Sequence, residues 1–199
     1  MKFFTSDTHF CDIGTIQTDG RPFKTAKAFD RYVIKLWNKQ AKKGDVIYVV
    51  GDFVDCDNSE STTYLTSLNY VKKIKADVIL IMGNNEDRVV KFFFDGDFEA
   101  FKKYCLSLGF KGVYKSLDIE VNDTPFHLVH KPIHCVKDKL NIFGHMHRAG
   151  GLYRSFGFNV NCDINHFYLY TEKDIKNMLY DKAKYWDVDA NLSLFSLDN

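Results

Sequence analysis

The sequence predicts an α/β fold built around a largely parallel β-sheet. Three short runs rich in Val, Ile, Phe and Leu, at residues 1–5, 46–50 and 78–82, are each followed closely by a polar residue. Runs of this length bounded by turn residues are typical of buried strands in a parallel sheet. Ligands bind just beyond the carboxyl ends of such strands. We therefore expect polar residues that are distant in the sequence to converge at one edge of the sheet.

Apolar residues with helical spacing lie between and after these runs. They form stripes in residues 29–37, 64–74 and 98–108. Each stripe predicts a helix with one face in the core, and none is interpreted as a cofactor-binding segment. Near the end of the chain, Thr171 is followed three residues later by Asp174, which resembles a capping box and predicts a last helix.

A second sheet is expected after residue 109, where the pattern changes from helical spacing to alternation. Apolar side chains at every second position of residues 117–121 share one face. Residues 122–123, Asn-Asp, provide a turn into a further strand at residues 126–130. This hairpin would begin the second sheet.

Length and composition predict one globular domain over residues 1–199. The chain is 45% hydrophobic and 16% aromatic, enough for a substantial core. Its 27 Lys and Arg balance 26 acidic residues, which argues against bulk electrostatic attachment to nucleic acid; contact with a nucleic acid end is left open but not favoured. No run approaches the length of a membrane span, and the first apolar run soon reaches an acidic residue. We expect a cytoplasmic protein with no membrane contact.

The cysteines are expected to be reduced thiols. None forms a Cys-x-x-Cys pair, and an odd number without a signal peptide fits a cytosolic protein and argues against a thiolate zinc site. They are Cys11, Cys56, Cys105, Cys135 and Cys162. Abundant Lys, Asn, Asp, Phe and Tyr hint at an AT-rich bacterial or phage genome.

Seven residues in five segments form a pattern of metal ligands. They are Asp7, His9, Asp52, Asn84, His130, His145 and His147. Carboxylate, imidazole and one amide oxygen together suit borderline divalent ions such as Mn²⁺, Fe²⁺, Zn²⁺, Co²⁺ or Ni²⁺, whereas Mg²⁺ and Ca²⁺ sites use oxygen ligands almost alone. An isolated Asp-x-His or Gly-Asp is common by chance, but their conjunction at strand ends is not. We interpret the set as a dinuclear metal site of a hydrolase.

The chain resembles the calcineurin-like metallophosphoesterases, whose pattern runs D-x-H, G-D, G-N-H-(D/E), H, then G-H-x-H. The matches lie in the same order over roughly residues 1–170, and residues 21–23, Arg-Pro-Phe, resemble the compact bacterial and phage branch. The resemblance implies a four-layer α/β/β/α sandwich of two mixed sheets and a two-metal phosphoester hydrolase. It assigns Asp7, His9 and His147 to the first metal, Asn84, His130 and His145 to the second, and Asp52 to a bridge between them.

The implied mechanism needs no side-chain nucleophile. Two cations about 3.5–4 Å apart can clamp a phosphoryl group, and a hydroxide shared between them is the nucleophile. Asp52 suits the bridge because its two oxygens carry a full negative charge that offsets the repulsion between cations. Serine-x-glycine elbows, a phosphate-binding P-loop and a GxGxxG segment are absent from the sequence, which removes the commonest rival enzyme classes.

The sequence departs from the family pattern at Asn85, where the family usually has histidine. That histidine lies over the phosphate and protonates the leaving group or stabilises charge. Asn85 can donate a hydrogen bond but cannot supply a proton at neutral pH. After His9, residues 10–12 read Phe-Cys-Asp in place of the more usual Phe-Gly-His. We expect metal binding to survive, and leave open an unusual substrate, a relocated acid or a weakened enzyme.

Four residues outside the ligand set are candidates for catalysis. His134 lies on the same loop as His130 and could be a relocated acid. Arg88 and Arg148 follow two of the motifs and would suit bidentate contact with a phosphate, the alternative being surface ion pairs. Asn85 is the fourth candidate, and Asp163 is interpreted as structural support.

The sequence thus predicts a phosphodiesterase acting on small phosphodiesters or nucleotides with two divalent ions. Mn²⁺ is the preferred ion, with Fe²⁺, Zn²⁺, Ni²⁺ and Co²⁺ as alternatives. No long insertion is available for a cap domain or a protein-binding groove. The alternatives are a phosphomonoesterase or protein phosphatase, and a weakly active metal-dependent nucleotide-binding protein, which Asn85 suggests.

Overall fold

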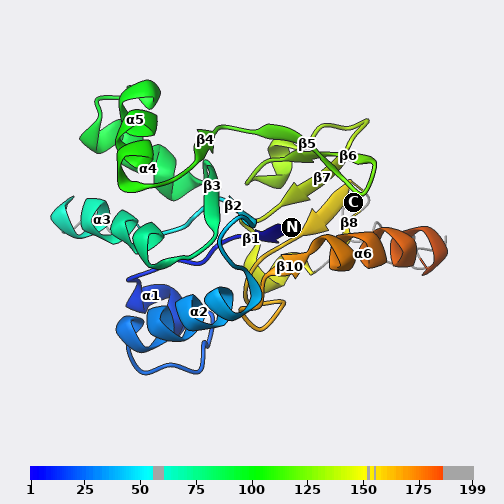
Figure 1. Cartoon of the computed structure of the whole chain (residues 1–199), viewed down its shortest axis with the longest axis horizontal. Helices are drawn as coiled ribbons and strands as arrows, with labels where there is room; N and C mark the ends of the chain where they lie inside the picture. Colours follow the sequence, from blue (N-terminus) through cyan, green and yellow to red (C-terminus); the bar gives the residue numbers. More distant parts are fainter. Residues whose placement is uncertain (56–60, 152, 155, 186–199) are drawn as a thin grey trace, which may run out of the picture.

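The computed structural model describes residues 1–55, 61–151, 153–154 and 156–185, and in them two five-stranded β-sheets are flanked by helices (Figure 1). The first sheet has the order β10-β1-β2-β3-β4, and only the β10–β1 pair is antiparallel. Its strands are β1 (Lys2–Thr5), β2 (Val46–Val50), β3 (Asp77–Ile81), β4 (Gly112–Tyr114) and β10 (Tyr170–Thr171). The three apolar runs form β1, β2 and β3, which confirms the predicted parallel strands.

The second sheet has the order β5-β6-β7-β9-β8 and is also mixed. Its two outer pairs, β5–β6 and β8–β9, are antiparallel, while β6–β7 and β7–β9 are parallel. Its strands are β5 (Leu117–Val121), β6 (Thr124–Leu128), β7 (Leu140–Phe143), β8 (Tyr153–Arg154) and β9 (Gly157–Asn159). The hairpin expected after residue 109 is β5–β6, so the predicted α/β fold with two mixed sheets is confirmed.

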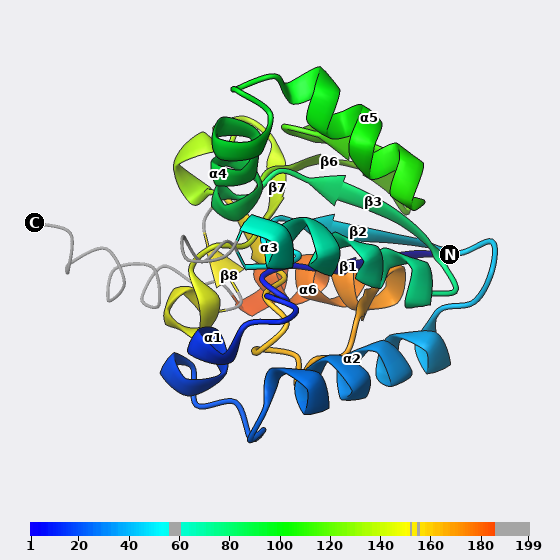
Figure 2. The same cartoon turned by 90° about the vertical axis from the view of Figure 1, so that its left-hand side faces the viewer.

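Helices α1 to α5 lie on one side of the first sheet, and the second sheet with α6 lies on the other (Figure 1). Figure 2 views the helical layer in front of β1, β2 and β3. The helices are α1 (Ile13–Thr18), α2 (Ala26–Gln40), α3 (Ser61–Ser67), α4 (Asn84–Phe93), α5 (Phe98–Leu108) and α6 (Glu172–Tyr185), with 3₁₀ turns η1 (Leu68–Lys73), η2 (Pro132–His134) and η3 (His147–Gly150).

Two details of the helices differ from or refine the expectations. The stripe in residues 64–74 is not one continuous helix, because α3 passes into the 3₁₀ turn η1 at Leu68. Ser67 and Asn69 at this junction are weak helix formers. The capping box before α6 is confirmed, since Asp174 N donates to Thr171 Oγ1 at 3.1 Å and Thr171 N donates to Asp174 Oδ2 at 2.7 Å.

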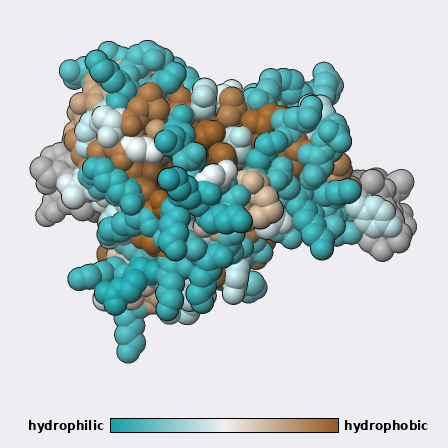
Figure 3. Space-filling model, viewed as in Figure 1, coloured by the Kyte–Doolittle hydropathy of each residue, from teal (hydrophilic) through white to brown (hydrophobic). Residues whose placement is uncertain are grey.

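The core consists of two hydrophobic clusters separated by the first sheet. Alternation along β1 sends Phe3 into the cluster beneath the helices and Phe4 into the cluster between the sheets. The predicted stripe on α2 is confirmed for Phe29, Val33 and Trp37, which are buried, whereas its Tyr32 is 44% exposed. On the face seen in Figure 3, hydrophilic residues cover most of the surface and hydrophobic residues show in patches between them.

No helix in the part of the chain that the structure describes is long and apolar enough to cross a membrane. Cys11, Cys105, Cys135 and Cys162 are free thiols, as predicted. Cys56 lies outside the described residues.

Phe10 joins the helical cluster to the loop that carries Asp7 and His9. Its ring is fully buried and lies 5.1 Å from the Phe53 ring, 5.6 Å from Trp37 and 5.5 Å from Tyr70, centroid to centroid. Aromatic pairs at these separations add to the free energy of area burial. The ring therefore ties the first ligand loop to the helices behind it.

We predict that Phe10→Ala lowers the free energy of unfolding by about 3–5 kcal/mol, because it leaves a cavity among rings that cannot close over it. Phe92→Ala is the matched control, since Phe92 is 56% exposed, and its effect should stay within about 0.5 kcal/mol. Urea unfolding of both variants measures the difference. Equal effects of the two substitutions would contradict this description of the core.

Candidate metal centre

The backbone is strained at most of the expected ligands. Asp7, His9, Asp52, His145 and His147 have φ of 55°, 50°, 51°, 71° and 45°. Residues other than glycine adopt this left-handed region uncommonly, at a cost of about 1–3 kcal/mol each, and such residues cluster at functional sites. In this fold they lie just after β1, β2 and β7. The strained loops at this edge of the two sheets therefore indicate a functional site.

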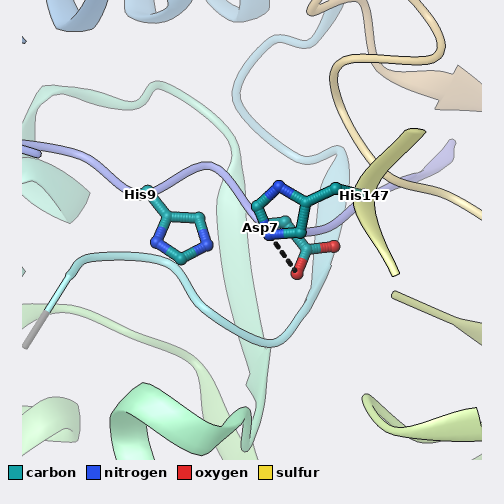
Figure 4. Close-up of side chains that lie close together, drawn as sticks. All are labelled: Asp7, His9 and His147. Carbon is teal, nitrogen blue, oxygen red and sulfur yellow. Dashed lines mark ion pairs between the residues drawn. The ribbon is translucent and has the colours of Figure 1, made fainter. Parts of the chain in front are cut away.

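Asp7, His9 and His147 form the first cluster (Figure 4). One ligand atom from each lies within 4.8 Å of the others. Asp7 is fully buried, and its Oδ1 is 3.8 Å from His147 Nε2. The other nitrogen of His147, Nδ1, is 2.5 Å from Asp19 Oδ2. A proton shared there leaves Nε2 of His147 free to bind a metal, as in carboxylate–histidine–metal arrangements.

Asp52, His130 and His145 form the second cluster, again with one ligand atom from each within 4.8 Å of the others. Asn84 belongs beside them, because its Oδ1 is 3.1 Å from His130 Nε2. His130 Nδ1 lies 2.8 Å from the carbonyl oxygen of Val50 and can donate to it. That hydrogen bond fixes the ring with Nε2 turned into the cluster.

One carboxylate oxygen connects the two clusters. Asp52 Oδ2 is 3.7 Å from His9 Nε2 and 3.4 Å from His130 Nε2. Burial opposes ionisation of Asp52, but the hydrogen bond and charge of His130 and the charge of His9 outweigh it and lower its pKa to about 2. Asp52 thus lies between the two clusters, close to a histidine of each.

The surroundings of His130 favour its positive charge, whereas burial lowers the pKa of His9 and of His145. Burial opposes protonation of His130, but its hydrogen bond to Asp52 and the charges of Asp7 and Asp52 raise its pKa to about 9. His9 is buried, and its Nε2 has no hydrogen-bond partner in the structure. A buried polar atom without a partner is costly unless something else binds it. The donor set and its charge suit divalent cations.

Glu86 holds the loops after β2 and β3 together. Its fully buried carboxylate accepts hydrogen bonds from Asp52 N at 2.9 Å, Phe53 N at 3.0 Å and Gly83 N at 2.7 Å. Burial and the charge of Asp52 raise the pKa of Glu86 to about 8, although the hydrogen bonds from Gly83 N and Asp52 N act in the opposite direction. Through Glu86, the backbone of Asp52 is fixed relative to the start of α4.

Arg21 holds the loop after β1 in the same way. It is 4% exposed and pairs with Asp163 through Nε at 2.9 Å and Nη2 at 2.8 Å. Its remaining donors reach the carbonyl oxygens of Thr8 at 2.8 Å and Asp7 at 2.9 Å. These contacts fit the supporting role expected of Asp163 and show that Arg21 fixes the left-handed turn at Asp7.

Asn85 lies at the centre of the site but faces the protein. It is 2% exposed, and its Nδ2 donates to Asp55 Oδ1 at 3.1 Å and lies 3.3 Å from His9 Nδ1. Its Oδ1 accepts from Asn84 Nδ2 at 3.4 Å, while its backbone N donates to Asp52 Oδ1 at 2.9 Å. Asn85 therefore touches a residue of each cluster.

The other three catalytic candidates are more exposed. His134 lines a cavity that also includes His130. Arg88 is exposed on α4, and Arg148 is exposed with its Nη2 3.9 Å from Asp163 Oδ1. That these arginines contact a phosphate stays a prediction. Two supporting residues carried no signal of their own in the sequence: Asp19, the partner of His147, and Asp55, the partner of Asn85.

Known proteins that are similar to this chain include two solved structures and one uncharacterized protein. The crystal structure of AQ665 from Aquifex aeolicus, a protein of unknown function, is 25% identical with a TM-score of 0.62 and covers 89% of this chain and 98% of its own. YfcE, a phosphoesterase from E. coli, is 14% identical with a TM-score of 0.41, covering 80% and 77%. The uncharacterized protein MJ1445 of Methanocaldococcus jannaschii is 26% identical over 90 residues. These residues are 45% of this chain and 49% of MJ1445, so the match spans about half the length of that relative.

The model of the calcineurin-like phosphoesterase family matches residues 3–188, which include all seven expected ligands. Members of this family are metal-dependent phosphoester hydrolases that bind divalent metals. Because the match covers most of the chain and agrees with the fold and with the two clusters of candidate metal ligands, this chain belongs to the calcineurin-like phosphoesterase family.

Proposed function

We propose that the protein is a dinuclear metal-dependent phosphodiesterase that acts on small phosphodiesters or nucleotides. The observation that carries the proposal is the position of Asp52 between two clusters of donors, with Oδ2 3.7 Å from a His9 nitrogen and 3.4 Å from a His130 nitrogen. A carboxylate shared in this way suits a pair of cations better than a single one.

The residues fit two divalent ions of borderline character. Asp7, His9 and His147 would hold one ion, and Asn84, His130 and His145 the other, with Asp52 shared. The unpartnered Nε2 of His9 is an atom that a metal would satisfy. Mixed imidazole and carboxylate donors favour Mn²⁺, Fe²⁺, Zn²⁺, Co²⁺ or Ni²⁺, and we prefer Mn²⁺. When bound, such a pair would polarise a phosphoryl group and activate water for attack on it.

The protein's own residues would orient the ligands and serve the leaving group. Asn85 accepts a hydrogen bond from the Asn84 amide nitrogen, which leaves the Asn84 amide oxygen facing His130 and the second cluster. The Asn85 side chain is buried, so we assign it to positioning rather than proton transfer. His134 is the residue we propose as the proton donor, because it is exposed in the cavity that His130 also lines.

Two alternatives remain in view. A phosphomonoesterase or protein phosphatase would use the same centre, and a weakly active metal-dependent nucleotide-binding protein is suggested by asparagine at position 85. Turnover of bis(p-nitrophenyl) phosphate with Mn²⁺ separates an enzyme from a binding protein. The ratio of this activity to that on p-nitrophenyl phosphate separates a diesterase from a monoesterase.

We predict that the protein reconstituted with Mn²⁺ holds two metal ions per chain and that EDTA abolishes its phosphoesterase activity. Elemental analysis after gel filtration gives the stoichiometry, and readdition of Mn²⁺ should restore turnover. Metal-free protein after reconstitution, or activity that is indifferent to EDTA, would overturn the proposal.

Asp52→Asn should reduce the metal stoichiometry below two and lower kcat on the order of 100-fold or more, since a neutral amide no longer offsets the repulsion between cations. Asp123→Asn is the matched control, because Asp123 is exposed in the β5–β6 turn. Circular dichroism should show that both variants remain folded. Near-normal turnover of Asp52→Asn would show that Asp52 is not the bridge.

His134→Ala should slow hydrolysis of an alkyl phosphoester about 10²–10⁴-fold while affecting a nitrophenyl ester much less, because a poor leaving group needs a proton from a general acid. His127→Ala is the control, since His127 pairs with Asp118 at 2.7 Å on β5. Asn85→His should change little if His134 supplies the proton. A selective gain on alkyl esters in Asn85→His would show instead that the acid is missing from the natural sequence.

A further inference from the structure

A small cavity of about 190 Å³ adjoins the second cluster of candidate ligands. His130 lines it directly, and so does Gly83, the residue before Asn84. A phosphoryl group at the metal centre would have this cavity beside it. The cavity is therefore placed to receive a part of the substrate attached to the scissile phosphorus.

Both apolar and charged residues line the cavity. Met82 and Val129 line it and are 6% and 4% exposed. Lys131 follows His130 on one wall, and Lys115 comes from the β4–β5 turn. Lys115 Nζ is 5.2 Å from the Phe98 ring, a contact that supports its long side chain. Two lysines from separate segments of the chain thus line the cavity.

The remaining ionisable groups of the cavity do not cancel this charge. Among the described residues that line it, Asp87 is the one carboxylate, exposed in the first turn of α4, and His134 adds no negative charge in either protonation state. With two lysines against one aspartate, the walls favour an anion. The apolar lining residues, Met82 and Val129, in turn favour a short carbon chain between that anion and the phosphorus.

The size of the cavity limits the group that it can hold. Pockets that enclose a drug-sized ligand measure about 300–1,000 Å³, and this one is about 190 Å³. It suits a group of a few carbon atoms ending in one anion, rather than a base and sugar together.

We propose that this cavity is the leaving-group subsite and that the leaving group is a short aliphatic alcohol carrying a second anionic group, a carboxylate or a phosphate. The proposal rests on the phosphoesterase function proposed above and narrows its substrate class. It also accounts for His134, which would protonate the leaving oxygen from the wall of the same cavity.

Calorimetric binding of phosphonates to the Mn²⁺-loaded protein tests the subsite without requiring turnover. The probes share a phosphonate and differ at the other end: propylphosphonate is neutral there, 3-phosphonopropionate and ethylene-1,2-bisphosphonate are anionic, and 3-aminopropylphosphonate is cationic. We expect the better anionic probe to bind at least about fivefold more tightly than propylphosphonate, the effect of one partly solvated ion pair. Which of the two anionic probes binds better identifies the group as carboxylate or phosphate.

Substitution of the cavity lysines distinguishes two explanations for tight binding of the anionic probes: contact of the second anion with the lysines, or its direct coordination to the metals. The ratio of the affinity for the better anionic probe to the affinity for propylphosphonate should fall towards one in Lys131→Met and in Lys115→Met. It should stay unchanged in Lys103→Met, where the lysine is exposed on α5. Chelation by the second anion would give the same preference in all of these proteins and would overturn the proposal. Tighter binding of 3-aminopropylphosphonate would also overturn it, by showing that Asp87 dominates. Equal binding of all probes would overturn the subsite proposal but leave the phosphoesterase proposal intact. Failure to bind any phosphonate would count against both proposals.

Discussion

The site depends on a backbone constraint: the chain must turn through left-handed conformations where it leaves the sheets. Five expected ligands have positive φ, and none is glycine. At about 1–3 kcal/mol each, these conformations would not persist in an isolated loop. Two buried polar side chains hold two of these turns, at Asp7 and at Asp52. Arg21 binds the carbonyl oxygens of Asp7 and Thr8, and Glu86 accepts from the backbone of Asp52 and Phe53. Hydrogen bonds to a charged group such as the Arg21 guanidinium contribute about 1.5–3 kcal/mol each, which is the size needed to offset the strain at Asp7.

The electrostatic interactions of these side chains indicate what the site can bind. The carboxylates of Asp7 and Asp52 are buried within reach of several imidazoles, and the outer nitrogens of His130 and His147 are already engaged by Val50 and Asp19. Each of these rings can therefore present its inner nitrogen to the centre. The raised pKa of His130 expresses a preference for positive charge at this ring, and the lowered pKa of Asp52 shows that the neighbouring imidazoles stabilise its negative charge. A proton satisfies that preference in part, and a divalent cation would satisfy it more fully.

The features of the sequence that predicted the fold are local ones. Apolar runs followed by polar residues predicted the strands β1, β2 and β3. They also predicted that Asp7, Asp52 and Asn84 lie close together, because the carboxyl ends of parallel strands share one edge of the sheet. The alternation in residues 117–121 placed the second sheet for the same kind of reason. The break between α3 and η1 was not predicted, since hydrophobic spacing does not distinguish a continuous helix from a helix followed by a 3₁₀ turn.

The supporting residues could not be predicted in the same way. Arg21 and Asp163 are separated by 142 positions, and His147 and Asp19 by 128, so their pairing depends on how the sheets close together. Asn85 shows most clearly which properties of a residue could not be predicted from the sequence. Its chemistry was evident from the sequence, but its burial and its contacts with His9, Asn84 and Asp55 required the structure. The same is true of the cavity beside His130, whose walls come from the ends of β3 and β6, the β4–β5 turn and η2.

The central claim is that these residues form a two-metal centre bridged by Asp52. Anomalous diffraction from crystals grown with Mn²⁺ tests it most directly. We expect two peaks about 3.5–4 Å apart, one bound by Asp7, His9 and His147, the other by Asn84, His130 and His145, with Asp52 contacting both. A single peak, or two peaks too far apart for one carboxylate to reach, would contradict the account.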